Sequence, residues 1–463
     1  MSKTNPARGM RDFLPADVRK RNYVINIIRE VYESYGFEPL ETPAVENLDT
    51  LMGKYGEEGN QLIFKILKRG EKLRQETGAE RQESDVSGLL SSVSGLADLA
   101  LRYDLTVPLA RVVANHRNDL PKFFKRYQIQ PVWRADRPAR GRFREFYQCD
   151  VDAIGSESVA VDCELISAVT TVLVRLGFTD FKIRVNHRRE LTDILNYLGV
   201  SPEKHEIALV SIDKMDKIGL SGVIEELESK QISKDSCLML SDFFGTFFER
   251  DRTSENRNEV IHHLISGGDL SVETYFQKLI AYSQNDYIEP DPTLARGLSY
   301  YTGGIFEIVL TDGDFKGSIG GGGRYDGLIG MFGKEQIPAC GFSLGLERIL
   351  VVMDERGMFP PEIAASTPAD VMVTVWSEET LAESLRLANE LRQNGLRVTL
   401  YPDADKLGKQ MKYADQIKVP WVCVLGENEI TEGKVTIKNM QTGEQQSVDR
   451  KDAFNFLLSS SEG

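Results

Sequence analysis

Positive charge and aromatic rings gather in one segment, residues 122–144. It contains one acidic residue, Asp136, and eight basic ones: Lys122, Lys125, Arg126, Arg134, Arg137, Arg140, Arg142 and Arg144. Arginines on a strand, a loop and a second strand can bind phosphate oxygens through paired hydrogen bonds. A charge run is more often a solvated surface, but such a surface does not need the interleaved rings of Phe123, Phe124, Tyr127, Trp133 and Phe143. The segment therefore predicts phosphate or nucleic-acid binding, with a solvated surface as the alternative.

Two glycine-containing patterns are less specific. The cluster KGSIGGGGRYDG at 316–327 has neither Walker nor Rossmann spacing, so its backbone either lies close against a ligand or turns tightly. GFSLG at 341–345 matches the nucleophile elbow of hydrolases, in which the acid and the histidine follow the serine. Every histidine here precedes Ser343, so a serine hydrolase is not expected.

The stretch ARGLSYYTGG at 295–304 places an arginine ahead of two tyrosines. We predict a strand over 300–311, and successive side chains of a strand face opposite sides of its sheet. On that prediction, at most one of Tyr300 and Tyr301 lines any one pocket.

Cysteines and histidines do not indicate a metal centre. The five cysteines are never closer than 14 residues, and none of the five histidines has a ligand spacing. We therefore expect neither zinc nor any metal held by protein ligands alone.

Composition narrows the class of protein. The chain has 463 residues, of which 41% are apolar, which suits a soluble protein of several domains. No membrane span and no secretory signal is recognisable, so we expect a cytoplasmic protein with no membrane partner. The net charge of −14 argues against general nucleic-acid affinity, although the segment 122–144 has a local excess of positive charge.

Hydrophobic periodicity along the chain predicts helices in some segments and strands in others. Helices are predicted over 17–35, 157–177 and 343–356, and strands over 181–187 and after Gly36. Residues 188–290 are helix-rich, and residues 69–98 read as a polar loop. After a proline-containing linker, strands and helices alternate from about 369, with a second helix over 404–417 in that region, which is typical of an α/β domain with a largely parallel sheet.

Several of these segments resemble the class II aminoacyl-tRNA synthetases, and within them the histidyl-tRNA synthetase family. GFEPLETPAVE at 36–46, with Pro43, resembles the first motif of the class, which lies at a dimer interface. The second and third motifs are matched by WRADRP at 133–138 with GRFREF at 141–146, and by GLER at 345–348. The segments that single out the histidine family are LRYDLT at 101–106, RGLSYY at 296–301 and GGRYD at 322–326.

The resemblance implies a fold and a division into domains. The core, 1–187 and 291–360, would be an α+β catalytic domain built on an antiparallel sheet flanked by helices. Residues 188–290 would be a helical insertion, 361–368 a linker, and 369–463 a C-terminal α/β anticodon-binding domain.

The resemblance also implies a reaction. L-histidine and ATP would give histidyl-adenylate, and the histidyl group would pass to the 3′ end of histidine tRNA. Arg134, Arg296 and Arg348 would be catalytic, with Arg134 and Arg296 near the α-phosphate and Arg348 on the γ-phosphate. ATP, with Mg²⁺ bound mainly through its phosphates, would also contact Asp136, Arg142 and Phe143.

Histidine binding would be shared between two groups of residues. Asp104, Thr106 and Gln148 would receive the α-ammonium group, and Asp152 and Tyr301 the imidazole nitrogens. Arg134, Arg296, Tyr300 and Tyr325 would complete the pocket. Asp104 and Asp152 stand where many bacterial members have glutamate, and the 69–98 segment looks longer than usual.

Contacts with tRNA are predicted in two places. Arg140 and Gly141 would meet the acceptor end, and Lys406, Lys409, Lys412 and Lys418 could meet phosphates, with a solvated helix face as the alternative. The family resemblance further implies a homodimer.

Two other functions compete with this reading. A non-catalytic, synthetase-like regulatory or sensor protein would tend to lose the arginines or the tail domain, which are present here. A synthetase for proline or threonine is disfavoured by the block at 296–301 and by the absence of zinc ligands.

Overall fold

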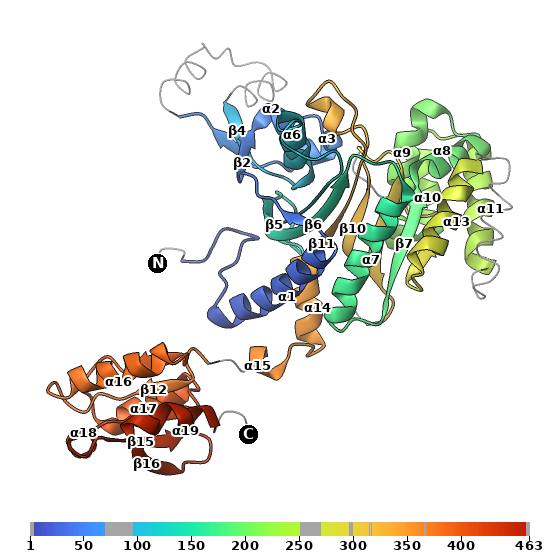
Figure 1. Cartoon of the computed structure of the whole chain (residues 1–463). Helices are drawn as coiled ribbons and strands as arrows, with labels where there is room; N and C mark the ends of the chain where they lie inside the picture. Colours follow the sequence, from blue (N-terminus) through green and yellow to red (C-terminus); the bar gives the residue numbers. More distant parts are fainter. Residues whose placement is uncertain are drawn as a thin grey trace. The chain divides into compact units, whose positions relative to one another are not determined.

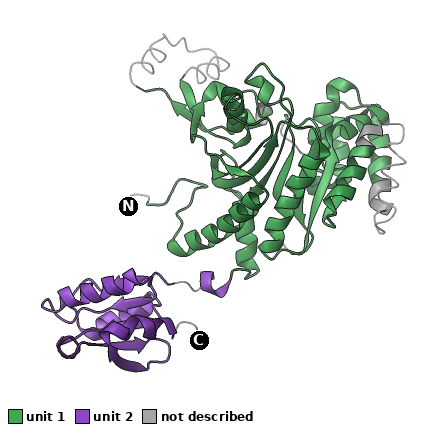
Figure 2. Ribbon diagram, viewed as in Figure 1, with its two compact units in different colours: residues 1–359 green, residues 360–463 purple. Residues whose placement is uncertain are grey.

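The computed structural model describes residues 4–69, 96–250, 270–295, 300–313, 315, 317–364 and 367–459. These residues form two compact units, 1–359 and 360–463 (Figure 2). Arg296 and most of the 69–98 segment lie outside the described residues. No helix among the described residues is long and apolar enough to cross a membrane.

An eight-stranded sheet organises the first unit (Figure 1). Its strand order is β1-β5-β6-β11-β10-β9-β7-β8, and all neighbours are antiparallel except the two edge pairs, β1 with β5 and β7 with β8. The strands are β1 (Glu38–Pro39), β5 (Phe124–Trp133), β6 (Glu145–Ile154), β7 (Phe181–His187), β8 (Ile288–Pro290), β9 (Gly304–Leu310), β10 (Ser318–Arg324) and β11 (Ala339–Gly345). This architecture confirms the α+β fold on an antiparallel sheet.

Helices and a small second sheet complete the first unit. The helices α1, α7 and α14 pack against one face of the large sheet, and a three-stranded sheet, β2-β4-β3, lies near α2 and α6 (Figure 1). These elements are α1 (Pro15–Ser34), α2 (Leu48–Leu51), α3 (Gly56–Gln61), α6 (Thr106–Asn115), α7 (Val159–Arg175), α14 (Leu346–Glu355), η2 (Ile329–Met331), β2 (Val45–Asn47), β3 (Lys65–Leu67) and β4 (Ala97–Leu101).

The helix-rich region between β7 and β8 packs around an apolar core that also includes Leu294, Ala295 and, from β9, Ile305. That core is made by residues such as Leu195, Leu209, Leu227 and Phe244. The elements are α8 (Arg188–Tyr197), η1 (Pro202–Lys204), α9 (His205–Ile212), α10 (Met215–Ser229), α11 (Lys234–Arg250) and α13 (Leu270–Ser283). The domain boundaries expected from the sequence stay a prediction.

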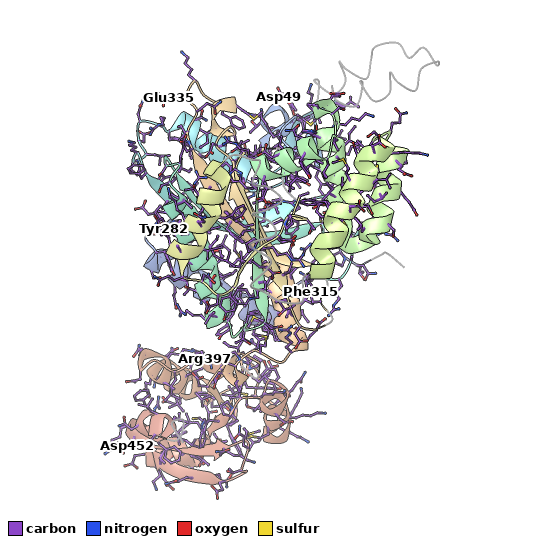
Figure 3. All side chains as sticks on the ribbon, turned by 90° about the vertical axis from the view of Figure 1, so that its right-hand side faces the viewer. Asp49, Tyr282, Phe315, Glu335, Arg397 and Asp452 are labelled. Carbon is purple, nitrogen blue, oxygen red and sulfur yellow. The ribbon has the colours of Figure 1, made fainter. Side chains whose placement is uncertain are left out.

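The second unit holds a five-stranded sheet in the order β13-β12-β14-β15-β16. The first three strands are parallel, and β15 and β16 add antiparallel pairs. Arg397, labelled in Figure 3, binds the carboxylate of Asp370 just before the sheet begins. The elements after the first unit are α15 (Pro361–Ala364), β12 (Val371–Val373), α16 (Leu381–Gln393), β13 (Val398–Leu400), α17 (Leu407–Gln416), β14 (Trp421–Val424), α18 (Glu427–Glu432), β15 (Lys434–Asn439), β16 (Gln445–Asp449), η3 (Arg450–Asp452) and α19 (Ala453–Ser459).

Some predicted elements have different bounds in the structure. The strand expected over 300–311 begins only at Gly304, and the helix expected over 343–356 begins at Leu346, because β11 continues to Gly345. The strand expected after Gly36 is two short strands, β1 and β2, in different sheets. These differences arise from pairing with distant strands, which local patterns do not encode.

The glycine cluster is a strand rather than a loop. In β10, a Cβ atom on Gly322 would overlap the carbonyl oxygen of Gly341 and lie 2.8 Å from Cα of Phe342. A Cβ atom on Gly321 would have only the carbonyl oxygen of Phe306, at 3.3 Å, within contact distance. The strand therefore needs glycine at 322 in order to pack against β11.

Gly322→Ala is expected to lower the free energy of unfolding by about 3 kcal/mol, the upper end of typical overpacking costs, because backbone atoms must move. Gly321→Ala is the matched control and should change stability by less than about 1 kcal/mol. Urea unfolding of both variants measures the difference, and equal midpoints would contradict this account of β10.

Candidate active site

The floor of the site is a grid of polar side chains on three adjacent strands. Residues two apart on a strand share a face, and the register places Arg126 of β5 beside Asp152 of β6. The same register pairs Gln128 with Asp150 and Gln130 with Gln148, and Asp150 with Ser343 of β11. Alternate residues, such as Cys149 and Val151, are buried.

An inner pocket of about 100 Å³ lies over this grid. Every histidine-binding candidate within the described residues lines it, and Arg296 lies outside them. The lining residues are Asp104, Thr106, Arg134, Gln148, Asp150, Asp152, Tyr300, Tyr301, Gly321, Gly322, Tyr325, Gly341, Phe342 and Ser343.

Asp104 is held at the start of α6. Its Oδ1 accepts hydrogen bonds from the Tyr55 hydroxyl at 2.9 Å and from the Val107 amide at 3.1 Å, and its Oδ2 from the Tyr300 hydroxyl at 3.2 Å. Burial raises the pKa of Asp104, and these donors and the charge of Arg134 act in the opposite direction. The carboxylate is therefore fixed in place at the edge of the pocket.

Asp152 is anchored from two sides. Its Oδ2 lies 2.8 Å from Nη2 of Arg126, which has no exposed surface, and its Oδ1 accepts a hydrogen bond from the Tyr325 hydroxyl. Burial raises the pKa of Asp152, and Arg126 opposes that rise. A Cβ atom on Gly341 would overlap Asp152 Oδ1, so glycine at 341 leaves the space that the carboxylate occupies.

Asp150 is a site residue that the sequence analysis missed. It is buried between Gln148 and Asp152 on the same face of β6, and its Oδ2 lies 4.0 Å from Arg126 Nη2. Burial raises the pKa of Asp150 to about 7, with Arg126 opposing and Asp152 adding to the rise. The alternation of β6 is the signal that would have found it, since residues 148, 150 and 152 must share a face.

The two tyrosines contradict the expectation that at most one of them lines a pocket. Tyr300 and Tyr301 precede β9 rather than lying on it, and both line the inner pocket. Burial raises the pKa of both hydroxyls, so both stay neutral at physiological pH. A turn, unlike a strand, can direct neighbouring side chains to the same side.

An outer pocket of about 220 Å³ adjoins the inner one. Arg134, Gln148, Gly321 and Ser343 line both pockets. The predicted ATP-binding residues Arg134, Asp136, Arg142, Phe143 and Arg348 all line the outer pocket, and Arg296 lies outside the described residues. The complete lining comprises Arg134, Asp136, Gly141, Arg142, Phe143, Phe146, Gln148, Ser318, Ile319, Gly320, Gly321, Ser343, Gly345, Glu347 and Arg348.

Three side chains that line the outer pocket, those of Phe143, Glu347 and Asp136, have neighbours that the sequence did not indicate. The guanidinium carbon of Arg11 lies 3.4 Å from the centroid of the Phe143 ring, so one face of the ring is already covered. Glu347 accepts a hydrogen bond from the Tyr147 amide at 3.0 Å, and burial raises its pKa to about 7. Asp136 is paired with Arg142 at 2.8 Å.

The composition of the basic segment 122–144 suggested a phosphate-binding surface, but its charged side chains do not form one continuous surface in the structure. Arg134 and Arg142 line the outer pocket, but Arg126 is buried in the floor and Lys125 pairs with Glu164 at 2.7 Å. Alternation along the strands directs neighbouring basic side chains to opposite faces of the sheet, and ion pairs hold others away from the pocket. Basic residues that are close in sequence therefore end in different environments.

The predicted tRNA contacts fall in both units. Arg140 pairs with Glu355, and its guanidinium lies 5.7 Å from the ring of Phe315, which is labelled in Figure 3. Gly141 has a φ of +67° and lines the outer pocket. In the second unit the predicted lysines are exposed, and Lys409 pairs with Asp405 at 2.7 Å; they are Lys406, Lys409, Lys412 and Lys418.

Comparison with known proteins identifies close relatives. Residues 9–75 and 70–349 match the family described as histidyl-tRNA synthetase, and residues 370–460 match an anticodon binding domain. Histidine–tRNA ligases of Christiangramia forsetii and Bacteroides fragilis are each 42% identical, the first over 98% of both chains and the second over 98% of this chain and 99% of the relative. The crystal structure of histidyl-tRNA synthetase from Nostoc sp. PCC 7120 has a TM-score of 0.76, with 31% identity over 99% of both chains.

Arg126→Met is expected to lower the free energy of unfolding by about 3–5 kcal/mol, because two buried carboxylates lose their cation. Without Arg126 the pKa values of Asp150 and Asp152 rise further above those of the unfolded chain. The folded variant then takes up protons at higher pH than the unaltered protein, whose Asp150 has a pKa of about 7, so its deficit is largest well above pH 7 and shrinks as the pH falls toward 7.

Urea unfolding at several pH values measures both effects. Arg175→Met is the matched control, since Arg175 pairs with Glu30 at the surface and its loss should cost less than about 1 kcal/mol. If Arg126→Met lowers the free energy of unfolding by no more than Arg175→Met does, or if its loss of stability grows as the pH falls, Arg126 is not the counter-charge of the two aspartates.

Proposed function

The chain belongs to the histidyl-tRNA synthetase family, and we propose that its two pockets divide the first reaction of that family between them. The protein is an aminoacyl-tRNA ligase. It activates L-histidine with ATP to histidyl-adenylate and pyrophosphate, and transfers the histidyl group to the 3′ end of histidine tRNA. The inner pocket holds histidine and the outer pocket holds ATP.

The shared lining of the two pockets is the observation that carries this proposal. A carboxylate oxygen of histidine must attack the α-phosphorus of ATP as pyrophosphate leaves, so the two substrates must meet. Arg134 lines both pockets, and its Nε donates to the carbonyl oxygen of Tyr103 at 3.0 Å, which fixes the guanidinium. A fixed cation at this junction stabilises the charge that develops on the α-phosphate.

The outer pocket suits the rest of ATP. Arg348 would hold the γ-phosphate, and the open face of Phe143 would stack on adenine while Arg11 covers the other face. Arg296 would assist Arg134 at the α-phosphate, as the resemblance implies. Each of these contacts would pair a cation or an aromatic ring with one part of the nucleotide.

We propose that Mg²⁺ enters the outer pocket together with ATP, bound mainly through the phosphate oxygens. Among the described residues, no group of three or more histidine, cysteine, aspartate or glutamate side chains could hold a metal ion. Mg²⁺ in nucleotide sites commonly uses one or two carboxylates together with phosphate oxygens. Asp136 and Glu347 are the carboxylates that line the outer pocket, and the ion would add positive charge to the phosphates.

The inner pocket suits histidine at both ends. Asp104, Thr106 and Gln148 would bind the α-ammonium group. Asp152 and the Tyr301 hydroxyl would each take one imidazole nitrogen, with Tyr300 and Tyr325 beside them. An amino acid lacking either ring nitrogen would leave a buried polar group unpaired, which is a strong source of discrimination.

The second substrate and the assembly complete the proposal. Residues 369–463 would bind the anticodon stem, with Lys406, Lys409 and Lys412 on phosphates, and Arg140 and Gly141 would meet the acceptor end. The enzyme would act as a homodimer through the segment around Pro43, in the cytoplasm, where tRNA is charged for translation. A regulatory protein is not favoured, because Arg134, Gln148 and Arg348 line the pockets.

Pyrophosphate exchange with each of the twenty amino acids tests the function. Exchange is expected with histidine alone, because only its ring offers two nitrogens to Asp152 and Tyr301. No exchange with any amino acid would favour the regulatory alternative, and exchange with another amino acid would refute the specificity.

Asp152→Asn is expected to raise the KM for histidine about tenfold or more, since a hydrogen bond to a charged group contributes about 1.5–3 kcal/mol. The KM for ATP should stay unchanged. Asp136→Asn is the matched control in the outer pocket and should alter the KM for ATP instead. An unchanged histidine KM in Asp152→Asn would rule out the imidazole contact.

A further inference from the structure

We propose that Asp150 and Ser343 are positioning residues, which turn the side-chain amide of Gln148 so that its oxygen faces the ammonium group of the bound amino acid. The inference rests on the proposed function, which supplies that ammonium group. It concerns two residues, Asp150 and Ser343, that the resemblance does not assign.

The register of the sheet brings the three side chains together. Ser343 is directly opposite Asp150 across β11 and β6, and Gln148 is two residues before Asp150 on the same face. Gln148 Nε2 donates to Ser343 Oγ at 3.0 Å, and the Ser343 side chain, directly opposite Asp150, acts against the rise in the pKa of that carboxyl group. All three residues line the inner pocket.

The direction of these hydrogen bonds follows from the chemistry of the groups. In its ionised form Asp150 only accepts hydrogen bonds, so the single hydroxyl hydrogen of Ser343 is then directed to the carboxylate opposite it. Ser343 can then only accept from Gln148, and Nε2 is the donor of the amide. With the amide turned over, Ser343 would have to donate to Asp150 and to Gln148 Oε1 at once, which one hydrogen cannot do.

The remaining atom of the amide is left for the substrate. Gln148 Oε1 is buried and has no hydrogen-bond partner among the described residues, and the same holds for Asp150 Oδ1. Buried acceptors in folded proteins are nearly always paired. An ammonium group has three N–H donors, and Asp104 and Thr106 line the same pocket to receive others.

Asp150 and Ser343 would also explain how Gln148 presents its amide oxygen, rather than its NH₂ group, to the substrate. A glutamine amide offers an oxygen and an NH₂ group of similar shape, and only the oxygen attracts a cation. If the amide were free to turn, the NH₂ group would face the ammonium group for part of the time. The carboxylate of Asp150, acting through one hydroxyl, removes that orientation.

Two ligands separate this effect from general damage to the pocket. Histidinol keeps the ammonium group and lacks the carboxylate, and 3-(imidazol-4-yl)propionate lacks the ammonium group. Their dissociation constants are measured by calorimetry on the full chain and on three variants: Asp150→Asn, Ser343→Ala and the double variant. In Asp150→Asn the new amide can donate to Ser343 and let Gln148 turn; in Ser343→Ala the connection is lost while the charge at 150 stays.

The dissociation constant of histidinol is expected to rise about tenfold in each single variant and no further in the double variant. That of the imidazolyl propionate should stay within about twofold. Ser343→Thr, which restores the hydroxyl, should recover most of the affinity lost in Ser343→Ala. In exchange assays the histidine KM should rise with kcat little changed.

Other results would overturn the inference. Equal weakening of both ligands would show general damage, and a loss in Asp150→Asn without one in Ser343→Ala would show an effect of charge alone. If the unaltered chain binds neither ligand and shows no histidine-dependent exchange, the proposed function itself fails. If it does both and the single variants bind histidinol normally, only the positioning role fails.

Discussion

The pairing of one buried arginine with two buried carboxylates is the constraint on which the site depends. Arg126 lies 2.8 Å from Asp152 and 4.0 Å from Asp150, and none of the three is open to solvent. Removing such ions from water costs several kcal/mol each, which their attraction offsets only in good geometry. Arg126 comes from β5 and the two aspartates from β6. This contact therefore both holds the register of the two strands and compensates the negative charge of the carboxylates that line the inner pocket.

The other neighbours of the inner pocket make room for this cluster. Gly341 has no side chain where Asp152 lies, and Gly322 has none where β10 meets β11. Glycine in mid-strand weakens a sheet in general, so its presence here reflects the close approach of neighbouring backbone and of the Asp152 carboxylate. The result is a pocket with polar groups on a rigid floor, which is the arrangement that a precise binding site requires.

Charge in this protein is sorted by the fold rather than by position in the sequence. The segment 122–144 carries a local excess of positive charge in a chain of net charge −14, but its members divide among the buried floor, the outer pocket and surface ion pairs. The positive charge available to ATP therefore comes from a few arginines on different elements. Among the arginines that the structure describes, Arg134, on the segment just after β5, is the one that lines both pockets.

The fold class, the family and most of the residues that line the two pockets can be predicted from the sequence, because short motifs keep the residue types that the chemistry needs. The sequence also located α1, α7 and β7 to within two residues, since their periodicity is local. The three-dimensional arrangement was needed to show that Tyr300 and Tyr301 share one pocket, that Arg126 is a buried counter-charge, and that Asp150 belongs to the site. The settings of Arg126 and Asp150 depend on which strands pair and in what register, and that of the two tyrosines on the turn before β9; both are set by contacts between residues far apart in the chain.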